Sequence, residues 1–111
     1  MREVEREILL GFWKVHILHH AAKEPVVGQW ILRELRRHGY CVSPGTLYPL
    51  LARMEKHGWL QSSVDPLGGP RARREYTLTE KGQEVLALIR GQVDEMYREI
   101  VLGEDDDHDH H

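Results

Sequence analysis

Arginine and lysine side chains gather in the middle of this sequence. Residues 28–77 hold eight of them against four carboxylates, although the whole chain carries a net charge of −3. The acidic excess lies in residues 104–111, which contain five carboxylates and no Lys or Arg, so that residues 1–103 are net positive. Cationic groups that neutralise phosphates release counterions from a polyanion and so gain affinity for it. The distribution indicates a nucleic-acid surface, with a merely solvated basic face as the alternative.

Three of these cations lie beside a predicted turn. Arg71, Arg73 and Arg74 follow residues 65–70, whose Pro and Gly residues are typical of a turn. The flanking residues 59–64 and 75–78 are predicted to be short strands, which makes the segment a hairpin with a basic arm. The arm could be a solubilising loop, but three arginines at one hairpin favour contact with DNA.

A helix predicted over residues 44–57 precedes the hairpin. Ser43 can cap it, and Pro44 then takes the first helical position, where a missing N–H costs nothing. One face is apolar at i, i+3, i+4, i+7 spacing: Leu47, Leu50, Leu51 and Met54. The other face is polar or basic and could enter the major groove of DNA. Pro49 removes one backbone hydrogen bond and should bend the early helix.

Three further helices are predicted, over residues 3–22, over residues 28–38 and from Thr79 to about residue 102. The last helix has apolar residues spaced by three and four, as in a coiled-coil seam: Leu86, Ile89, Val93, Met96 and Ile100. Such a seam needs a covering surface. It predicts a homodimer, with packing inside one chain as the alternative.

The order of these elements predicts a fold that is mostly α with a small two-stranded β wing. We interpret residues 1–78 as a winged helix-turn-helix DNA-binding domain, residues 79–103 as a C-terminal dimerisation helix and residues 104–111 as a disordered acidic and His-rich tail. No signal peptide and no apolar run of membrane-spanning length is found, and the single Cys41 suits a reducing compartment. These features predict a cytoplasmic protein without membrane association.

Residues 42–60, which read Val-Ser-Pro-Gly-Thr-Leu-Tyr-Pro-Leu-Leu-Ala-Arg-Met-Glu-Lys-His-Gly-Trp-Leu, resemble the signature of PadR-type transcriptional regulators. The resemblance extends over roughly residues 8–90. It implies a prokaryotic, dimeric winged-helix repressor of the short-tailed type, in which the last helix makes the dimer with help from the first. The chain departs from the pattern before the second helix, where Val27-Gly28-Gln29 replaces a His-Gly-Tyr triplet and Trp30 supplies an aromatic ring one position later.

The predicted function is therefore DNA-binding transcriptional regulation, most simply repression, by a homodimer on an inverted-repeat operator. Release by a small-molecule effector is compatible with this prediction. The predicted partner is double-stranded DNA, and the predicted DNA-binding residues are Ser43, Thr46, Tyr48, Pro49, Arg53, Lys56, Arg71, Arg73 and Arg74. For Tyr48, a half-buried packing role is an equal alternative. Motifs of enzymes are absent from the sequence, so neither catalysis nor a cofactor is predicted.

Parts of the sequence are also compatible with two other functions. His16 and His20 have the i, i+4 spacing of metal ligands, His19 lies beside them, and Asp and His residues fill positions 105–111, so a metal-responsive regulator is one alternative. An exposed helix end and a solvated acidic tail are the preferred explanation of these residues, and no metal site is predicted. A winged helix that binds protein is the other alternative, but such a domain would not need the basic wing.

Overall fold

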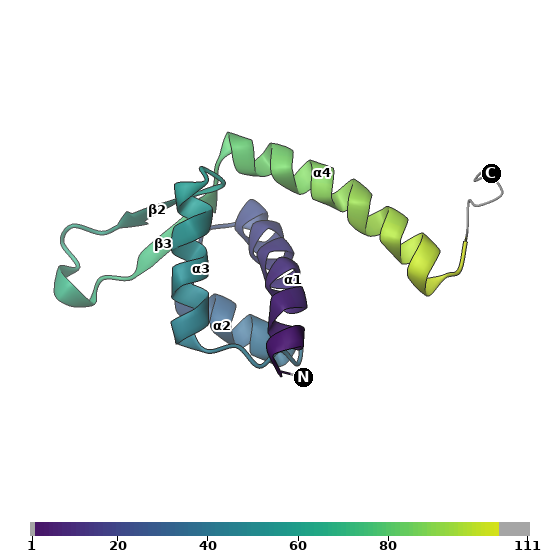
Figure 1. The fold of residues 1–111 in the computed structure, drawn as a ribbon. Coiled ribbons are helices and arrows are strands. Elements are labelled where there is room, and N and C mark those ends of the chain that lie inside the picture. Colours follow the sequence, from purple (N-terminus) through teal and green to yellow (C-terminus); the bar gives the residue numbers. More distant parts are fainter. Residues whose placement is uncertain (1, 105–111) are drawn as a thin grey trace.

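The computed structural model describes residues 2–104 (Figure 1), with the side chains of residues 2–5 and 71 left undescribed. Helix α1 runs over Arg2–Lys23 and buries one stripe of its surface: Trp13, Ile17, Leu18 and Ala21. The apolar residues of α1 cover a wider arc than this stripe. Ile8 and Phe12 remain 59% and 45% exposed, so the described residues leave part of the arc without cover.

Helices α2 (Gly28–Arg37) and α3 (Pro44–Lys56) complete the helical body. The buried side chains of α2 are Ile31, Leu32 and Leu35, and those of α3 are the predicted Leu47, Leu50, Leu51 and Met54. Gly39 and Gly58 follow the two helices with φ of +92° and +82°, a conformation that glycine adopts without a steric penalty. The apolar faces of α1, α2 and α3 share one core.

The sheet has three antiparallel strands in the order β1-β3-β2, one more than the predicted two-stranded wing. Strands β2 (Leu60–Val64) and β3 (Arg74–Leu78) form the wing, as expected. The third strand, β1 (Val26–Val27), pairs with β3 in the register Val26↔Tyr76 and Val27↔Glu75. Two residues are too few to show a strand period, so only this long-range pairing reveals β1.

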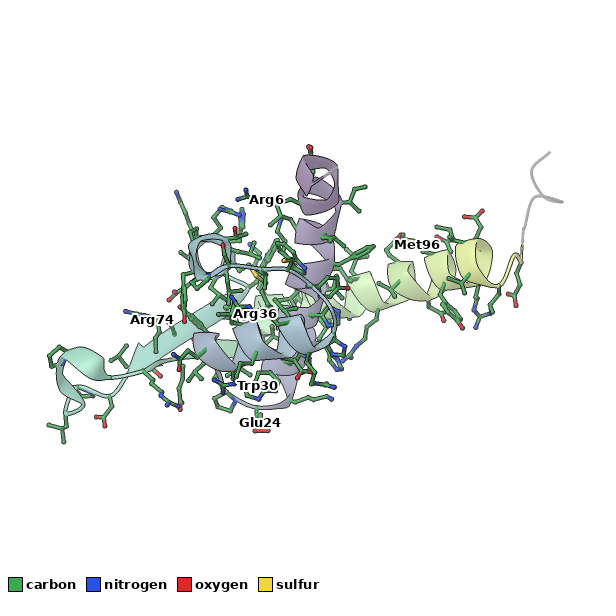
Figure 2. The ribbon with its side chains drawn as sticks, turned by 90° about the horizontal axis from the view of Figure 1, so that it is seen from below. Arg6, Glu24, Trp30, Arg36, Arg74 and Met96 are labelled. Carbon is green, nitrogen blue, oxygen red and sulfur yellow. The ribbon has the colours of Figure 1, made fainter. Side chains whose placement is uncertain are left out.

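Helix α4 spans Glu80–Met96 and continues as one π-helical turn over Tyr97–Val101. Thr79 caps the start of the helix, because its side chain accepts a hydrogen bond from the Gly82 N–H. Leu86 is buried in the core and Ile89 packs against it, whereas the helix beyond them extends away from the body (Figure 1). The wing extends to the opposite side of the body, as Arg74 and Met96 show in Figure 2.

The sequence also predicts a disordered tail and no membrane association. The predicted disordered tail lies outside the described residues, apart from Glu104. Among the helices of residues 2–104, none is long and apolar enough to cross a membrane.

Candidate nucleic-acid interface

Helix α3 turns its polar face outward while its four apolar residues hold it to the core. Tyr48, Pro49, Arg53 and Lys56 are exposed, and Thr46 is half-buried at the edge of the face. The helix continues through Pro49, which leaves the Gly45 carbonyl without its usual i+4 donor. The sequence prediction of a helix with one core face and one free face is confirmed.

The start of α3 is organised differently from the expected side-chain cap. The Ser43 carbonyl accepts hydrogen bonds from the N–H groups of Thr46 and Leu47, at 3.0 and 2.9 Å. The Ser43 hydroxyl makes no bond to the helix backbone and instead donates to Thr46 Oγ1 at 3.3 Å. The two hydroxyl groups predicted to approach DNA therefore lie together at the first turn.

Tyr48 packs against the beginning of α2. A Cβ atom added to Gly28 would come within 2.5 Å of Tyr48 Cε1, so the tyrosine ring occupies space that only glycine leaves free. Tyr48 therefore has the packing role that was the alternative to DNA contact, yet the residue remains 42% exposed. Tyr48 keeps an open edge next to the outward face of α3.

The wing is a hairpin with a structured tip. Asp65 accepts hydrogen bonds from Leu67 N–H through Oδ1 and from Gly68 N–H through its carbonyl oxygen, both at 3.0 Å. A 3-10 turn over Gly69–Arg71 follows, and it brings the chain back into β3. These local bonds hold the base of the arginine arm in a defined path.

The wing is tied to α3 by a chain of hydrogen bonds. Arg74 donates to Ser62 Oγ at 2.9 Å, and the Ser62 hydroxyl donates to Glu55 Oε2 at 2.7 Å. Arg73 is exposed and makes no hydrogen bond or ion pair to any described side chain. The arm thus has one anchored arginine and one that is free to bind an external anion.

The arginines of α2 are largely engaged within the chain. Arg36 donates from Nε to the Val42 carbonyl at 3.1 Å. Arg37 makes a two-pronged contact with Glu34, at 3.1 and 2.8 Å, and this contact lowers the pKa of the Glu34 carboxyl to about 2. Apart from the exposed Arg33 of α2, the uncommitted positive charge of residues 28–77 therefore lies on α3 and the wing.

Glu34 is also the centre of a histidine cluster between α1 and α2. Its Oε2 atom lies 3.1 Å from His38 Nε2 and 3.7 Å from His20 Nε2, and the His16 ring lies 5.2 Å from the His38 ring. Burial, aided by neighbouring basic groups, lowers the pKa values of His16, His19 and His20 from 6.5. The metal-site alternative raised from the sequence grouped the α1 histidines with the tail. It did not include Glu34 or His38, which lie beside these histidines in the structure. Nowhere in residues 2–104 are three or more His, Cys, Asp or Glu side chains grouped as metal ligands.

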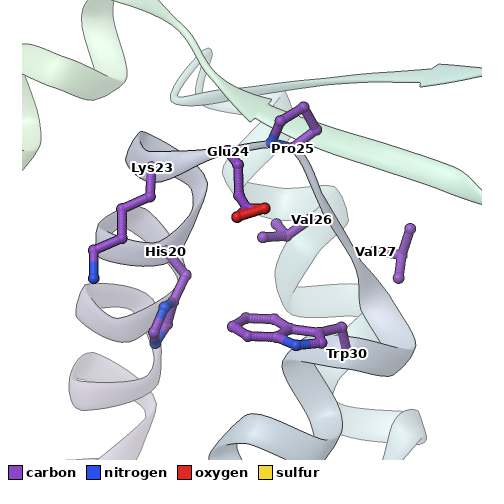
Figure 3. A pocket seen from close by; sticks show the side chains of 7 residues that line it. All are labelled: His20, Lys23, Glu24, Pro25, Val26, Val27 and Trp30. Atoms are coloured by element: carbon purple, nitrogen blue, oxygen red, sulfur yellow. The ribbon is translucent and has the colours of Figure 1, made fainter.

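Two hollows lie away from the wing. One, of about 430 Å³, lies between the end of α1 and the start of α2, where Trp30 meets the edge of His20 with ring centroids 5.1 Å apart (Figure 3). The other, also of about 430 Å³, lies between α1 and α4 and is largely apolar. Val15, Val93 and Tyr97 contribute to its wall.

The predicted dimer seam divides into two parts. Leu86 and Ile89 pack within the chain, whereas Val93, Met96 and Ile100 are 47%, 46% and 69% exposed. The exposed part continues onto other apolar residues of the same helix end: Tyr97, Val101 and Leu102. The first two seam residues thus attach α4 to the body, and the last three are left largely uncovered by residues 2–104.

Comparison with known proteins identifies the family to which this chain belongs. Residues 17–88 match the model of the family described as "Transcriptional regulator PadR-like family". The chain belongs to this family. The regulator is similar to the transcriptional regulator Rv3488 of Mycobacterium tuberculosis, with 46% identity over 104 residues that cover 94% of this chain and 92% of that protein.

Solved PadR-like structures have the same fold. A PadR-like transcription factor from Bacteroides fragilis matches with a TM-score of 0.76 and 25% identity, over 92% of this chain and 99% of its own. A PadR-like regulator from Bacillus cereus matches with a TM-score of 0.71 and 30% identity, over 88% and 99%. The resemblance inferred from residues 42–60 is confirmed, and the chain is a DNA-binding transcriptional regulator rather than an enzyme.

Proposed function

We propose that this regulator represses transcription by binding an inverted-repeat operator as a homodimer. The observation that carries the proposal is the placement of two DNA-binding features side by side. Helix α3 exposes a polar and basic face, and the arginine arm of the wing is joined to that helix through Arg74, Ser62 and Glu55. A helix and a basic wing held in one fixed arrangement match adjacent grooves of a duplex.

Each element has a distinct role in this proposal. The first half of α3 enters the major groove, where Ser43, Thr46, Tyr48 and Pro49 approach the bases. Arg53 and Lys56 bind phosphates at the edge of the groove. The arm, with Arg71, Arg73 and Arg74, follows the backbone or the neighbouring minor groove.

The dimer is proposed from the exposed end of α4. Apolar side chains exposed along one helix lose favourable burial unless a partner covers them. Val93, Met96 and Ile100 offer such a seam, and Ile8 and Phe12 of α1 extend the uncovered apolar surface. A second copy, related by two-fold symmetry, supplies the complementary seam and presents a second α3.

The hollow between α1 and α4 is the candidate site for a small-molecule effector. It borders the proposed dimer seam through Val93 and has a predominantly apolar wall. A ligand there would shift α4 relative to the DNA-binding body and change the distance between the two copies of α3. Such a change would release the operator.

Genome-wide binding by the purified protein, followed by a reporter fused to the promoter it binds, tests the proposal. We expect sites with inverted repeats and higher reporter output when the regulator is deleted. Lower output on deletion would contradict the repressor role. Absence of any selected DNA would contradict the proposed function itself.

A further inference from the structure

A third hollow lies at the junction of α2, α3 and the wing. Its volume is about 330 Å³. Its wall is formed by the start of α2, by Tyr48 of α3 and by the β3 side of the wing. Its polar lining residues are Gln29, Tyr48, Arg73, Arg74 and Tyr76.

The chemistry of this wall suits an oxyanion. Both charged residues in it are arginines, and the remaining polar residues are an amide and two phenols, all of which can donate hydrogen bonds. Burial raises the pKa of Tyr76, so its phenol stays protonated and able to donate. No carboxylate is part of the described wall. The nearby Glu55 carboxylate already accepts a hydrogen bond from Ser62.

The walls are fixed relative to one another by contacts within the chain. Strand β1 leads directly into α2 and pairs with β3, with Val27 opposite Glu75. Gly28 lets the Tyr48 ring lie against α2, and Arg74 is held by Ser62. Glu75 and Asp65 line a neighbouring hollow, which Arg73 also borders, so Arg73 lies between the two hollows while these carboxylates stay outside the wall described above.

We propose that this hollow seats one phosphate of the DNA backbone, with Gln29 and Arg73 as its principal ligands and the Tyr48 hydroxyl as a third donor. The inference rests on the proposed function, since the hollow borders the outward face of α3 through Tyr48. It assigns a DNA contact to Gln29, at the position where this chain departs from the family triplet. It also gives Tyr48 a packing role and a contact role together, because the ring faces Gly28 while part of the residue stays exposed.

Substitutions at Gln29 test the assignment by charge. Gln29→Glu puts a carboxylate beside the phosphate and should weaken DNA binding at least about tenfold, the equivalent of ~1.4 kcal/mol. Gln29→Ala removes only a hydrogen bond and should cost about two- to fivefold. Gln83→Glu is the matched control, because it makes the same charge change on the exposed surface of α4. Equal effects of Gln29→Glu and Gln83→Glu would overturn the assignment.

Single methylphosphonate substitutions in the operator locate the phosphate. They replace one charged phosphate at a time, and one position in each half-site should weaken wild-type binding but have little further effect on a Gln29→Ala, Arg73→Ala variant. If no position shows this coupling while wild-type protein binds the operator, the phosphate site is wrong and the proposed function stands. If wild-type protein binds no DNA, the proposed function fails first.

Inorganic phosphate separates the DNA backbone from a free anion as the occupant. Without DNA, millimolar phosphate should leave the NMR signal of the Gln29 side-chain amide nearly unchanged, because one phosphate lacks the neighbouring contacts of a duplex. A saturating shift at millimolar phosphate, together with no methylphosphonate coupling, would assign the hollow to a small anion and overturn the proposal.

Discussion

The arginines in the middle of the sequence are chemically alike but do different things. Arg37 is neutralised by Glu34, Arg36 holds the carbonyl of Val42, and Arg74 links the wing to α3. Arg73 is exposed without an internal partner among the described side chains. The sequence predicts a concentration of basic residues, but it could not separate these roles, because Val42 and Ser62 reach the arginines only after folding.

Arg73→Ala should weaken operator and scrambled DNA alike, since a phosphate contact positions the protein without reading sequence. Loss of one contact per subunit removes about two per dimer. The slope of log affinity against log salt should then fall by about 1.8, at ~0.9 per phosphate. Titrations at several salt concentrations measure the slope. An unchanged slope in the triple variant Arg71→Ala, Arg73→Ala, Arg74→Ala would remove the wing from the interface.

Thr46→Ala should behave differently from Arg73→Ala. Thr46 lies at the first turn of α3, and its hydroxyl accepts a bond from Ser43, so the pair can present oriented hydroxyl groups to base edges. We expect operator affinity to fall by roughly 1–3 kcal/mol while affinity for scrambled DNA stays within about twofold. Titration of both duplexes decides the matter. Equal loss on both duplexes would show that Thr46 does not contribute to sequence recognition.

Among the elements, the histidines of α1 couple the packing of this helix against α2 and α4 to pH. The folded state lowers the pKa values of His16, His19 and His20, so the unfolded chain binds protons more readily in this range. Their contribution to stability is therefore complete above pH 6.5 and declines as the pH falls below it. The lowered pKa of Glu34 acts in a separate window, since its contribution is present above pH 4.5 and is lost toward pH 2.

We expect the free energy of unfolding to fall between pH 7 and pH 5, and the double variant His16→Gln, His19→Gln to have a flatter profile. The two variant positions lose their titration, whereas His20 keeps its contact with Glu34. Urea unfolding at closely spaced pH values measures both profiles. If the double variant retains the full wild-type slope, the pH dependence arises outside this cluster.

Most elements could be predicted from local pattern, and the exceptions share a cause. The helical stripes, Gly39, Gly58 and the Thr79 cap are short-range signals, and the structure follows them. Strand β1 depends on a partner some 50 residues away, and the hollow around Gln29 depends on β1. The division of the α4 seam after Ile89 likewise depends on where α1 ends its contact with α4, which no periodicity reveals.

At the scale of the whole molecule, the wing and the free end of α4 extend to opposite sides of the body (Figure 1). One end carries exposed cations, and the other carries exposed apolar side chains. In the proposed dimer, this separation would let two-fold pairing through α4 leave both proposed DNA-binding faces open. The family and the fold class could be predicted from residues 42–60 and the element order, whereas dimerisation stays a prediction.

Val93→Glu tests the seam. A carboxylate placed among exposed apolar residues would be buried without a partner in the dimer, which is strongly unfavourable. Light scattering should give roughly twice the 13.0 kDa chain mass for the wild type and about one chain mass for the variant, and the variant should lose operator binding. Gln83→Glu should remain dimeric. A wild-type protein that is monomeric at micromolar concentration would contradict the seam assignment.

Hydroxyl-radical footprinting of the purified protein on its operator tests whether a two-fold dimer binds DNA through α3 and the wing. A two-fold dimer that uses α3 and the wing should protect two symmetrical patches on one face of the duplex. Their centres should lie about one helical turn or a small multiple of it apart, at ~10 bp per turn, over an inverted repeat. A single protected patch on an asymmetric site would contradict binding by a symmetrical dimer.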